Sequence, residues 1–404
     1  MHETQTKAML MSFLRENTNL EVVDRGEWFY AVLKCSDDRM GDENNDSDEQ
    51  RRQIAEKSAN RSPIAFRADM DAVCGQDGKP GHYCGHDGHS SILCGTAVLL
   101  SQAMKTCGNE QVGDRNNNSN ADCQAQVIGC KCIDPVESVA VGLSREELNR
   151  DVYFIFQPGE EIGAGAKLCR EFISEKNIGE VYGLHNIPGY PRNHVLTIDG
   201  TFACASTGLE IHMTGAASHA AYPEAGKNPG PALARLLLEV EKLTEEYNRS
   251  RGFVRMTLIG MDVGSANYGV AASEGTLRMT VRAEKEKVFA AYVDEIKQLA
   301  RNMADDGEFE LEIQEIERFP ATENHAENVD KLRKCAADQD IVVTELAEPM
   351  RWSEDFGYYL QATNGAFFGI GDGEGYAQLH TAGYEFPDEI IETAIKMFVG
   401  LALM

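Results

Sequence analysis

The sequence predicts an α/β protein that carries a second, inserted α+β unit. Four short apolar runs, each followed by polar residues, are typical of buried parallel strands. From about Gly208 onwards the pattern changes to alternating strands and two amphipathic helices. The chain of 404 residues also has the length of two domains, at roughly 100 to 200 residues each.

The elements of the first unit come in an order that is typical of an α/β sheet. A helix is expected over residues 3–14, followed by a strand over 28–33. The four buried strands are expected at 64–68, 152–156, 181–184 and 365–370, and further helices at 90–104, 164–174 and 389–403. Open α/β sheets bind ligands beyond the carboxyl ends of their strands, so functional side chains are expected there.

The inserted unit has the β-α-β-β-α-β order of a ferredoxin-like arrangement. Its strands are expected at 209–213, 255–259, 275–283 and 309–316, and its helices at 231–247 and 288–303. We therefore expect one unit made of residues 1–206 and 318–404, and an inserted unit of residues 207–317.

The charge and composition narrow the class of partner. The chain has 38 Lys and Arg against 65 Asp and Glu, a net charge of -27 that repels phosphate backbones and anionic lipids. No apolar run reaches the ~18 residues of a membrane helix, and the N-terminus does not resemble an export signal. Eleven cysteines, an odd number, predict reduced thiols or metal ligands in the cytoplasm. A small-molecule partner is favoured over nucleic acid or membrane.

Two polar segments, 36–62 and 107–150, are expected to be surface loops. The second holds Cys107, Cys123, Cys130 and Cys132. A structural zinc on these thiolates is an alternative, although the paired spacing of zinc ribbons is absent.

The run Cys84-Gly85-His86-Asp87-Gly88-His89 places a thiol, two imidazoles and a carboxylate just before a predicted helix. Sulfur and imidazole together favour zinc, cobalt, nickel or manganese over magnesium or calcium. The alternative is a polar helix cap, because histidines often satisfy backbone groups at helix ends.

Further candidate ligands follow the other predicted strands. Glu160 and Glu161 come after the strand at 152–156, and adjacent carboxylates favour one metal ligand with a base beside it, or else an acidic first turn of a helix. His185 follows the next strand and His380 the last one, where either alone could be an ordinary histidine. Five candidate ligands at one sheet edge exceed what one tetrahedral zinc needs, which indicates two ions that share a bridging group.

Other templates are absent from the sequence. It contains no HExxH, no Walker-type phosphate loop and no G-x-S-x-G nucleophile motif. The glycine-rich run at 369–375 does not open a helix, which argues against a dinucleotide site.

Six motifs resemble the auxin-conjugate and hippurate hydrolases, the amidohydrolase branch of the aminoacylase and carboxypeptidase-type metallopeptidases. In chain order they are Phe66-Arg67-Ala68-Asp69-Met70-Asp71-Ala72, His82 to His89, Phe156 to Glu161, Gly183-Leu184-His185, Ser218-His219 through Pro223, and Leu379-His380. The resemblance covers nearly the whole chain.

The resemblance implies a di-zinc-exopeptidase-like catalytic domain, with a mixed sheet flanked by helices, and an inserted lid that carries the contact of a homodimer. It implies that two divalent ions (Mn, Zn, Co or Ni) are bridged by Cys84, with the other ligands supplied by His86, Glu161, His185 and His380. Glu160 would be the general base and acid, and Asp71 would orient a metal ligand.

In the lid, the resemblance implies that His219 polarises the scissile carbonyl of the substrate, often in the site of the neighbouring subunit. Asn267 and Arg278 match positions that hold the free carboxylate of the substrate, although an arginine on a strand is often a solvated charge. The sequence departs from the family pattern at Val73-Cys74 and after Asn267, which leaves the shape of the acyl pocket open, and it also departs in the two polar segments.

The expected activity is therefore metal-dependent hydrolysis of an N-acyl amino acid or a similar conjugate. Two alternatives remain. The same architecture could act as a dipeptidase or another exopeptidase, or it could be a metal-dependent small-molecule-binding or sensor protein without turnover.

Overall fold

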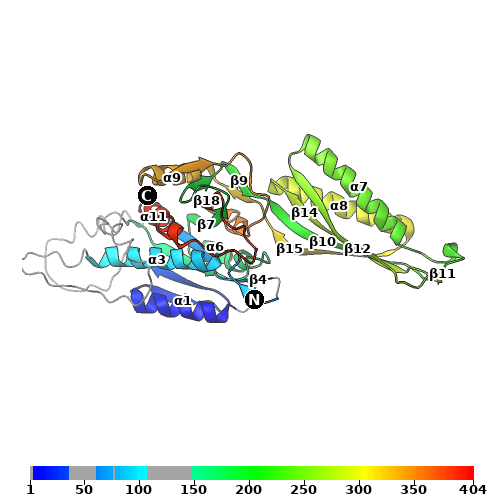
Figure 1. Cartoon of the computed structure of the whole chain (residues 1–404), viewed down its shortest axis with the longest axis horizontal. Coiled ribbons are helices and arrows are strands. Elements are labelled where there is room, and N and C mark those ends of the chain that lie inside the picture. Colours follow the sequence, from blue (N-terminus) through cyan, green and yellow to red (C-terminus); the bar gives the residue numbers. More distant parts are fainter. Residues whose placement is uncertain (1–2, 36–60, 76–77, 107–147) are drawn as a thin grey trace, which may run out of the picture.

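A computed structural model describes residues 3–35, 61–75, 78–106 and 148–404. The two largest sheets follow one another along the long axis of the molecule, each with its own helices (Figure 1). Most of the polar segment 36–62, most of the segment 107–150 and the four cysteines proposed as a zinc site lie outside the described residues.

The first sheet is mixed and has eight strands in the order β1-β2-β6-β3-β7-β18-β8-β17. Its strands are β1 (Glu21–Asp24), β2 (Phe29–Leu33), β3 (Ile64–Asp69), β6 (Val152–Gln157), β7 (Glu180–Pro188), β8 (Val195–Thr197), β17 (Val343–Glu345) and β18 (Asn364–Gly373). The central strands β6, β3, β7 and β18 are mutually parallel and almost wholly buried. The prediction of four buried parallel strands is therefore confirmed.

Helices cover both faces of the first sheet. One face packs against α1 (Thr4–Asn17), α3 (His86–Thr106), α9 (Ala326–Ala337) and α11 (Ile391–Leu403). The other face packs against α5 (Gly165–Cys169), α6 (Glu171–Glu175) and α10 (Gly357–Leu360). The helix expected over 164–174 is thus two short helices joined at Arg170, and α9 was not predicted.

The second sheet is antiparallel and has the order β12-β14-β10-β15. Its strands are β10 (Ala205–Thr214), β12 (Val254–Val263), β14 (Glu274–Ala283) and β15 (Glu310–Phe319). Helices α7 (Gly230–Ser250) and α8 (Glu286–Gly307) pack on one face and enclose a separate apolar core. This element order confirms the predicted β-α-β-β-α-β pattern, whereas the domain boundaries at 206/207 and 317/318 stay a prediction.

Short strand pairs complete the structure. β9 (Gly200–Ala203) pairs with β16 (Thr322–Asn324), so the chain segments that enter and leave the second sheet lie beside each other. β4 (Val73–Cys74) pairs with β5 (Pro80–Gly81), and β11 (Ser218–His219) pairs with β13 (Val270–Ala271) at the far end of the second sheet (Figure 1). None of the described helices is long and apolar enough to cross a membrane.

Candidate metal centre

Strand β3 leads directly into the site. Asp71 follows the end of this strand, and its Oδ1 lies 3.2 Å from Nδ1 of His86. Its Oδ2 accepts the backbone N–H of Glu161 at 3.1 Å. One buried carboxylate therefore holds both the ring of His86 and the backbone of Glu161.

Cys84 and His86 approach the site through a tight turn before α3. Gly85 between them has φ of 93°, in the left-handed region, and a Cβ there would lie 2.6 Å from Oδ1 of Asn186. Only glycine fits this turn, because it combines a left-handed backbone with a close approach. His86 is the first residue of α3, so the helix includes more of the motif than predicted.

The remaining predicted donors come from three further segments. Glu160 and Glu161 follow β6, and His380 lies in the loop after β18, where its φ of 61° is also left-handed. His185 lies inside β7, which runs on to Pro188 and so ends later than predicted. The Nδ1 of His185 faces the carbonyl oxygen of Asn186 at 2.7 Å, which leaves Nε2 free to face the site.

These side chains form two donor groups that share one sulfur atom. The first group is Cys84, His86 and His185, and the second is Cys84, Glu161 and His380, with all ligand atoms of each group within 4.8 Å of one another. The Sγ of Cys84 lies 3.5 Å from Nε2 of His185 and 3.2 Å from Nε2 of His380. We call Cys84, His86, Glu161, His185 and His380 the donor cluster.

Two buried atoms in the donor cluster support a cation there. Nε2 of His86 and Oε1 of Glu161 have no hydrogen-bond partner among the described residues, yet they lie 3.7 Å apart. Buried polar atoms are normally satisfied, and a cation between a neutral imidazole and a carboxylate would satisfy both. The thiol, imidazole and carboxylate donors thus fit divalent transition metals.

Burial and neighbouring charges shift the pKa values in the site. Burial raises the pKa of Glu160 well above its usual value, and Glu354, Asp355 and Glu161 add to this shift. Burial lowers the pKa of His185, whereas the neighbouring Cys84 thiol and the Glu161 carboxylate raise the pKa of His380 to about 10. A bound cation would favour the ionised carboxylates and the thiolate.

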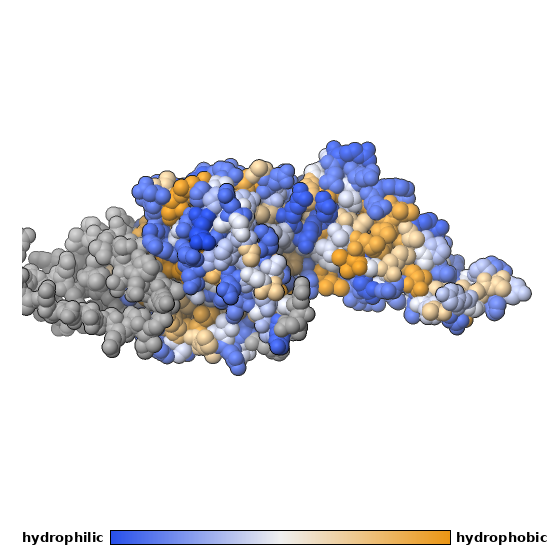
Figure 2. Space-filling view, viewed as in Figure 1, coloured by the Kyte–Doolittle hydropathy of each residue, from blue (hydrophilic) through white to orange (hydrophobic). Residues whose placement is uncertain are grey.

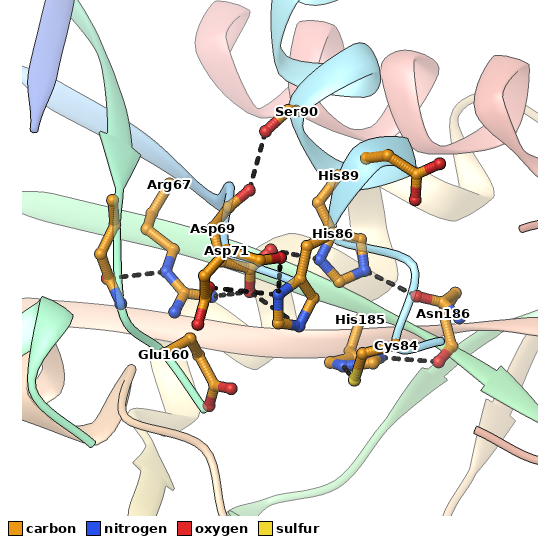
Figure 3. Close-up of polar contacts among 12 residues, drawn as sticks. Arg67, Asp69, Asp71, Cys84, His86, His89, Ser90, Glu160, His185 and Asn186 are labelled. Atoms are coloured by element: carbon orange, nitrogen blue, oxygen red, sulfur yellow. Dashed lines mark hydrogen bonds and ion pairs between the residues drawn. The ribbon is translucent and has the colours of Figure 1, made fainter. Parts of the chain in front are cut away.

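Further polar residues beside the donor cluster were not predicted as site residues. Asp69 lies between the rings of His86 and His89, with its Oδ1 at 2.6 Å from Nδ1 of His89 (Figure 3). The other nitrogen of His89 faces Oδ1 of Asn186 at 2.7 Å. Asp69 lies in the motif at 66–72 and His89 in the motif at 82–89, and the alternation of Arg67, Asp69 and Asp71 is the sequence signal that points to them.

Three predicted residues lie on the second unit and not in the donor cluster. His219 lies in β11, and Asn267 lies in the loop before β13, at the end of the second sheet far from the first sheet (Figure 1). Arg278 on β14 binds Glu210 at 2.6 Å and Asp262 at 2.5 Å. The proposed roles of these three residues stay predictions.

The fold and the thiol, imidazole and carboxylate donors at its sheet edge define a class of protein, the metal-dependent hydrolases. The chain belongs to peptidase family M20/M25/M40, whose family model matches residues 139–404, more than half of the chain. It is accordingly a metal-dependent hydrolase of amide bonds.

Curated relatives align with most of the chain. An N-acetylcysteine deacetylase of Bacillus subtilis (strain 168) is 23% identical over 352 residues, covering 84% of this chain and 81% of the relative. The IAA-amino acid hydrolase ILR1-like 2 of Arabidopsis thaliana is 24% identical and covers 84% of this chain and 72% of the relative. An N-acetyldiaminopimelate deacetylase of Leuconostoc mesenteroides is 28% identical, with coverage of 79% and 75%.

Solved structures share the fold. The Bacillus subtilis YXEP protein, described as a dinuclear metal binding peptidase from the M20 family, superimposes with a TM-score of 0.70 at 20% identity, covering 99% of this chain and 91% of that chain. The aminobenzoyl-glutamate utilization protein from Klebsiella pneumoniae gives a TM-score of 0.61 at 19% identity, with coverage of 99% and 90%.

Proposed function

We propose that this protein is a di-metal amidohydrolase that cleaves N-acyl amino acids or similar conjugates, with Glu160 as the general base. The observation that carries the proposal is the position of Glu160. Its carboxylate is buried, and one of its oxygens lies within 4.8 Å of a ring nitrogen of His86 and of a carboxylate oxygen of Glu161. A carboxylate there can take a proton from water at one oxygen and return it to the leaving amine.

The donor cluster would hold two divalent cations, drawn from Mn, Zn, Co and Ni, with Cys84 between them. When bound, such a pair polarises the scissile carbonyl and lowers the pKa of water towards neutrality. Asp71 supports this assignment because it holds His86 by Nδ1 and so leaves Nε2 for the cation.

The substrate class follows from the relatives. Their names describe three substrates: N-acetylcysteine, N-acetyldiaminopimelate and a conjugate of IAA with an amino acid. Each of these substrates contains an amide bond next to an amino-acid carboxylate. We propose the same class here, with Asn267 and Arg278 as the groups that hold the carboxylate. Arg278 would then release Glu210 or Asp262 and bind the substrate carboxylate in its place.

We further propose a homodimer that forms through the second unit. Strand β12 is the edge of the second sheet, and it exposes Leu258 and Ile259, while α7 exposes Leu238. Figure 2 shows apolar surface on this unit beside α7. An apolar sheet edge is a typical place for a second chain to bind, and a second copy would allow His219 to reach the partner subunit's site.

A complementation experiment tests the dimer and the role of His219 together. Glu160→Gln and His219→Ala chains, each inactive alone, should recover about a quarter of wild-type activity when co-expressed, because half of the dimers are mixed and each mixed dimer has one complete site. A monomer by light scattering, or no recovery in mixed dimers, would contradict the proposal.

The compartment that we propose is the reducing cytoplasm. Cys84, Cys169, Cys204 and Cys335 are free thiols in the structure. A metal-binding thiolate at Cys84 needs a reduced sulfur, which an oxidising compartment does not favour.

The first experiment combines elemental analysis with a substrate panel. Purified protein should contain about two ions per chain, and it should release amino acids from acetyl-, benzoyl- or indolyl-acyl conjugates in a chelator-sensitive way. Cleavage of free dipeptides alone would favour the exopeptidase alternative. Two bound ions without any turnover would favour the binding protein.

The second experiment separates base from ligand. Glu160→Gln should keep its metal and lose several orders of magnitude in kcat, whereas Glu161→Ala should lose metal as well. The matched control is Glu171→Gln, at an exposed carboxylate on α6. A kcat for Glu160→Gln within about tenfold of wild type would rule out the base assignment.

A further inference from the structure

Arg67 is a charged side chain in the interior of the first sheet, only 2% exposed. Its Nη1 donates to Asp69 Oδ2 at 2.7 Å, and its Nε donates to Gln157 Oε1 at 2.9 Å. Its Nη2 donates to Asp355 Oδ1 at 2.8 Å and lies 3.0 Å from Glu354 Oε1. The guanidinium therefore touches both the strand that leads to the ligands and the segment behind Glu160.

A continuous path of contacts connects Arg67 to Glu160. The backbone N–H of Asp355 donates to Oε1 of Glu160 at 3.3 Å. The carboxylate of Asp355 is itself held by Arg67, by Nε2 of Gln157 at 2.8 Å and by the backbone N–H of Ala166 at 2.8 Å. These bonds fix the position of the N–H group that faces Glu160.

The charges around Glu160 require such an anchor. Carboxylate oxygens of Glu160, Glu354 and Asp355 lie within 4.8 Å of one another, and all three residues are buried. Buried like charges repel strongly unless a cation lies among them or one of the carboxyl groups is protonated. Arg67 pairs with two of the three, so its loss would let the segment 354–355 move away from Glu160.

Stability alone is a weak explanation for this arrangement. A buried ion pair costs so much desolvation that apolar residues of the same volume often stabilise a fold at least as well. What the guanidinium fork adds is a defined direction for each partner, since its N–H groups are fixed in one plane. The geometry therefore fits the placement of a reactive group better than it fits fold stability.

We propose that Arg67 is a positioning residue for Glu160, acting through Asp355 and Glu354. The inference rests on the proposed role of Glu160 as general base. Arg67 holds the base in place without contacting the substrate, because the guanidinium is enclosed by Asp69, Gln157 and the segment 354–355.

The test compares Arg67→Lys with Arg150→Lys. Arg150 is a matched control, because it is also buried, at 5% exposure, and bonds to the Leu401 carbonyl at 3.1 Å, away from the site. Both variants should melt at a lower temperature than wild type. Only Arg67→Lys should lose about tenfold or more in kcat, with KM within about threefold and about two ions retained, because a misplacement of about 1 Å is that costly.

Two results with these variants would overturn the inference. One is a kcat of Arg67→Lys within about twofold of that of Arg150→Lys. The other is a loss of bound metal in Arg67→Lys that accounts for its loss of kcat, because Arg67 would then act on the ligands through Asp69.

A double-mutant cycle isolates the path to Glu160. In a Glu160→Gln background, Arg67→Lys should change the residual kcat by less than about twofold, because positioning matters only for a working base. If Arg67→Lys does not fold, Glu354→Gln replaces it in the same cycle, since it removes one charge that Arg67 binds. If Glu160→Gln has lost its activity and Arg67→Lys still lowers the residual kcat by its full factor, the inference is overturned and the proposed function stands. If Glu160→Gln keeps its activity, the proposed function and the inference are both overturned.

Discussion

Asp71 fixes the ring of His86, because its Oδ1 lies 3.2 Å from Nδ1 and its own carbonyl oxygen lies 3.1 Å from the same atom. Carboxylate partners of this kind orient metal-binding imidazoles and raise their basicity. We expect Asp71→Ala to weaken metal binding about 10- to 100-fold, as measured by competition with a chelator. Asp199→Ala, at a largely exposed carboxylate, is the control, and equal metal affinity in both variants would contradict the assignment.

Cys84 belongs to both donor groups, so its loss should affect both ions. Cys84→Ala is expected to retain less than about one ion per chain, because each remaining group keeps only two of its three donors. His380→Ala leaves Cys84, His86 and His185 intact and should retain about one. Elemental analysis distinguishes these outcomes, with the buried thiol variant Cys335→Ala as the control. Equal metal content in Cys84→Ala and Cys335→Ala would exclude the shared sulfur.

Phe289 is the test of the separate core in the second unit. Its side chain on α8 is fully buried among residues of α7, α8 and the second sheet. Phe289→Ala should cost about 3 to 5 kcal/mol, through lost apolar contact and a residual cavity. Hydrogen exchange of α7 and α8 measures this local cost. Arg301→Ala on the exposed face of α8 should stay within about 0.5 kcal/mol, and a similar effect for both variants would argue against a distinct core.

The sequence was sufficient for the elements that bury long apolar faces. Strands β3, β6, β7 and β18 read as continuous apolar runs because helices cover both faces of the sheet. Short strands such as β8 and β17 have three residues each, too few to show any period. Helix α9 did carry a signal in its buried Val329, Leu332 and Ala336, but its many charged residues concealed it.

Only part of the candidate site could likewise be predicted from the sequence. The donors of the cluster could be predicted because their residue types and spacing are specific to metal binding. The contact between Arg67 and Asp355 could not be predicted, because the two residues are 288 positions apart in the sequence. Neither residue lies in a local sequence pattern that is typical of metal binding. The roles proposed for His219 and Asn267 stay predictions, because β11 and the loop before β13 lie at the far end of the second sheet and these roles depend on the proposed dimer.

Glu180 links the acid stability of the first unit to one partly buried cluster of charges. Its carboxylate binds Lys331, accepts the hydroxyl of Tyr182 at 3.1 Å and lies 3.6 Å from Arg150. Burial raises the pKa of Glu180, but Lys331 and Arg150 outweigh burial and lower the pKa below its ordinary 4.5. The ionised form is therefore the one that the folded state favours.

Because the pKa of Glu180 is lower in the folded than in the unfolded state, its stabilisation is complete above the unfolded value of 4.5 and is lost as the pH falls through the folded value. Glu180→Gln should therefore lower the free energy of unfolding by about 1 kcal/mol near neutral pH. The difference from wild type should shrink as the pH falls from 4.5 through the lower folded value, below which the carboxylate of the folded wild-type protein is also protonated. Urea titrations of both proteins at neutral and acidic pH measure it. A difference that stays constant with pH would mean that the carboxylate contributes through packing and not through its charge.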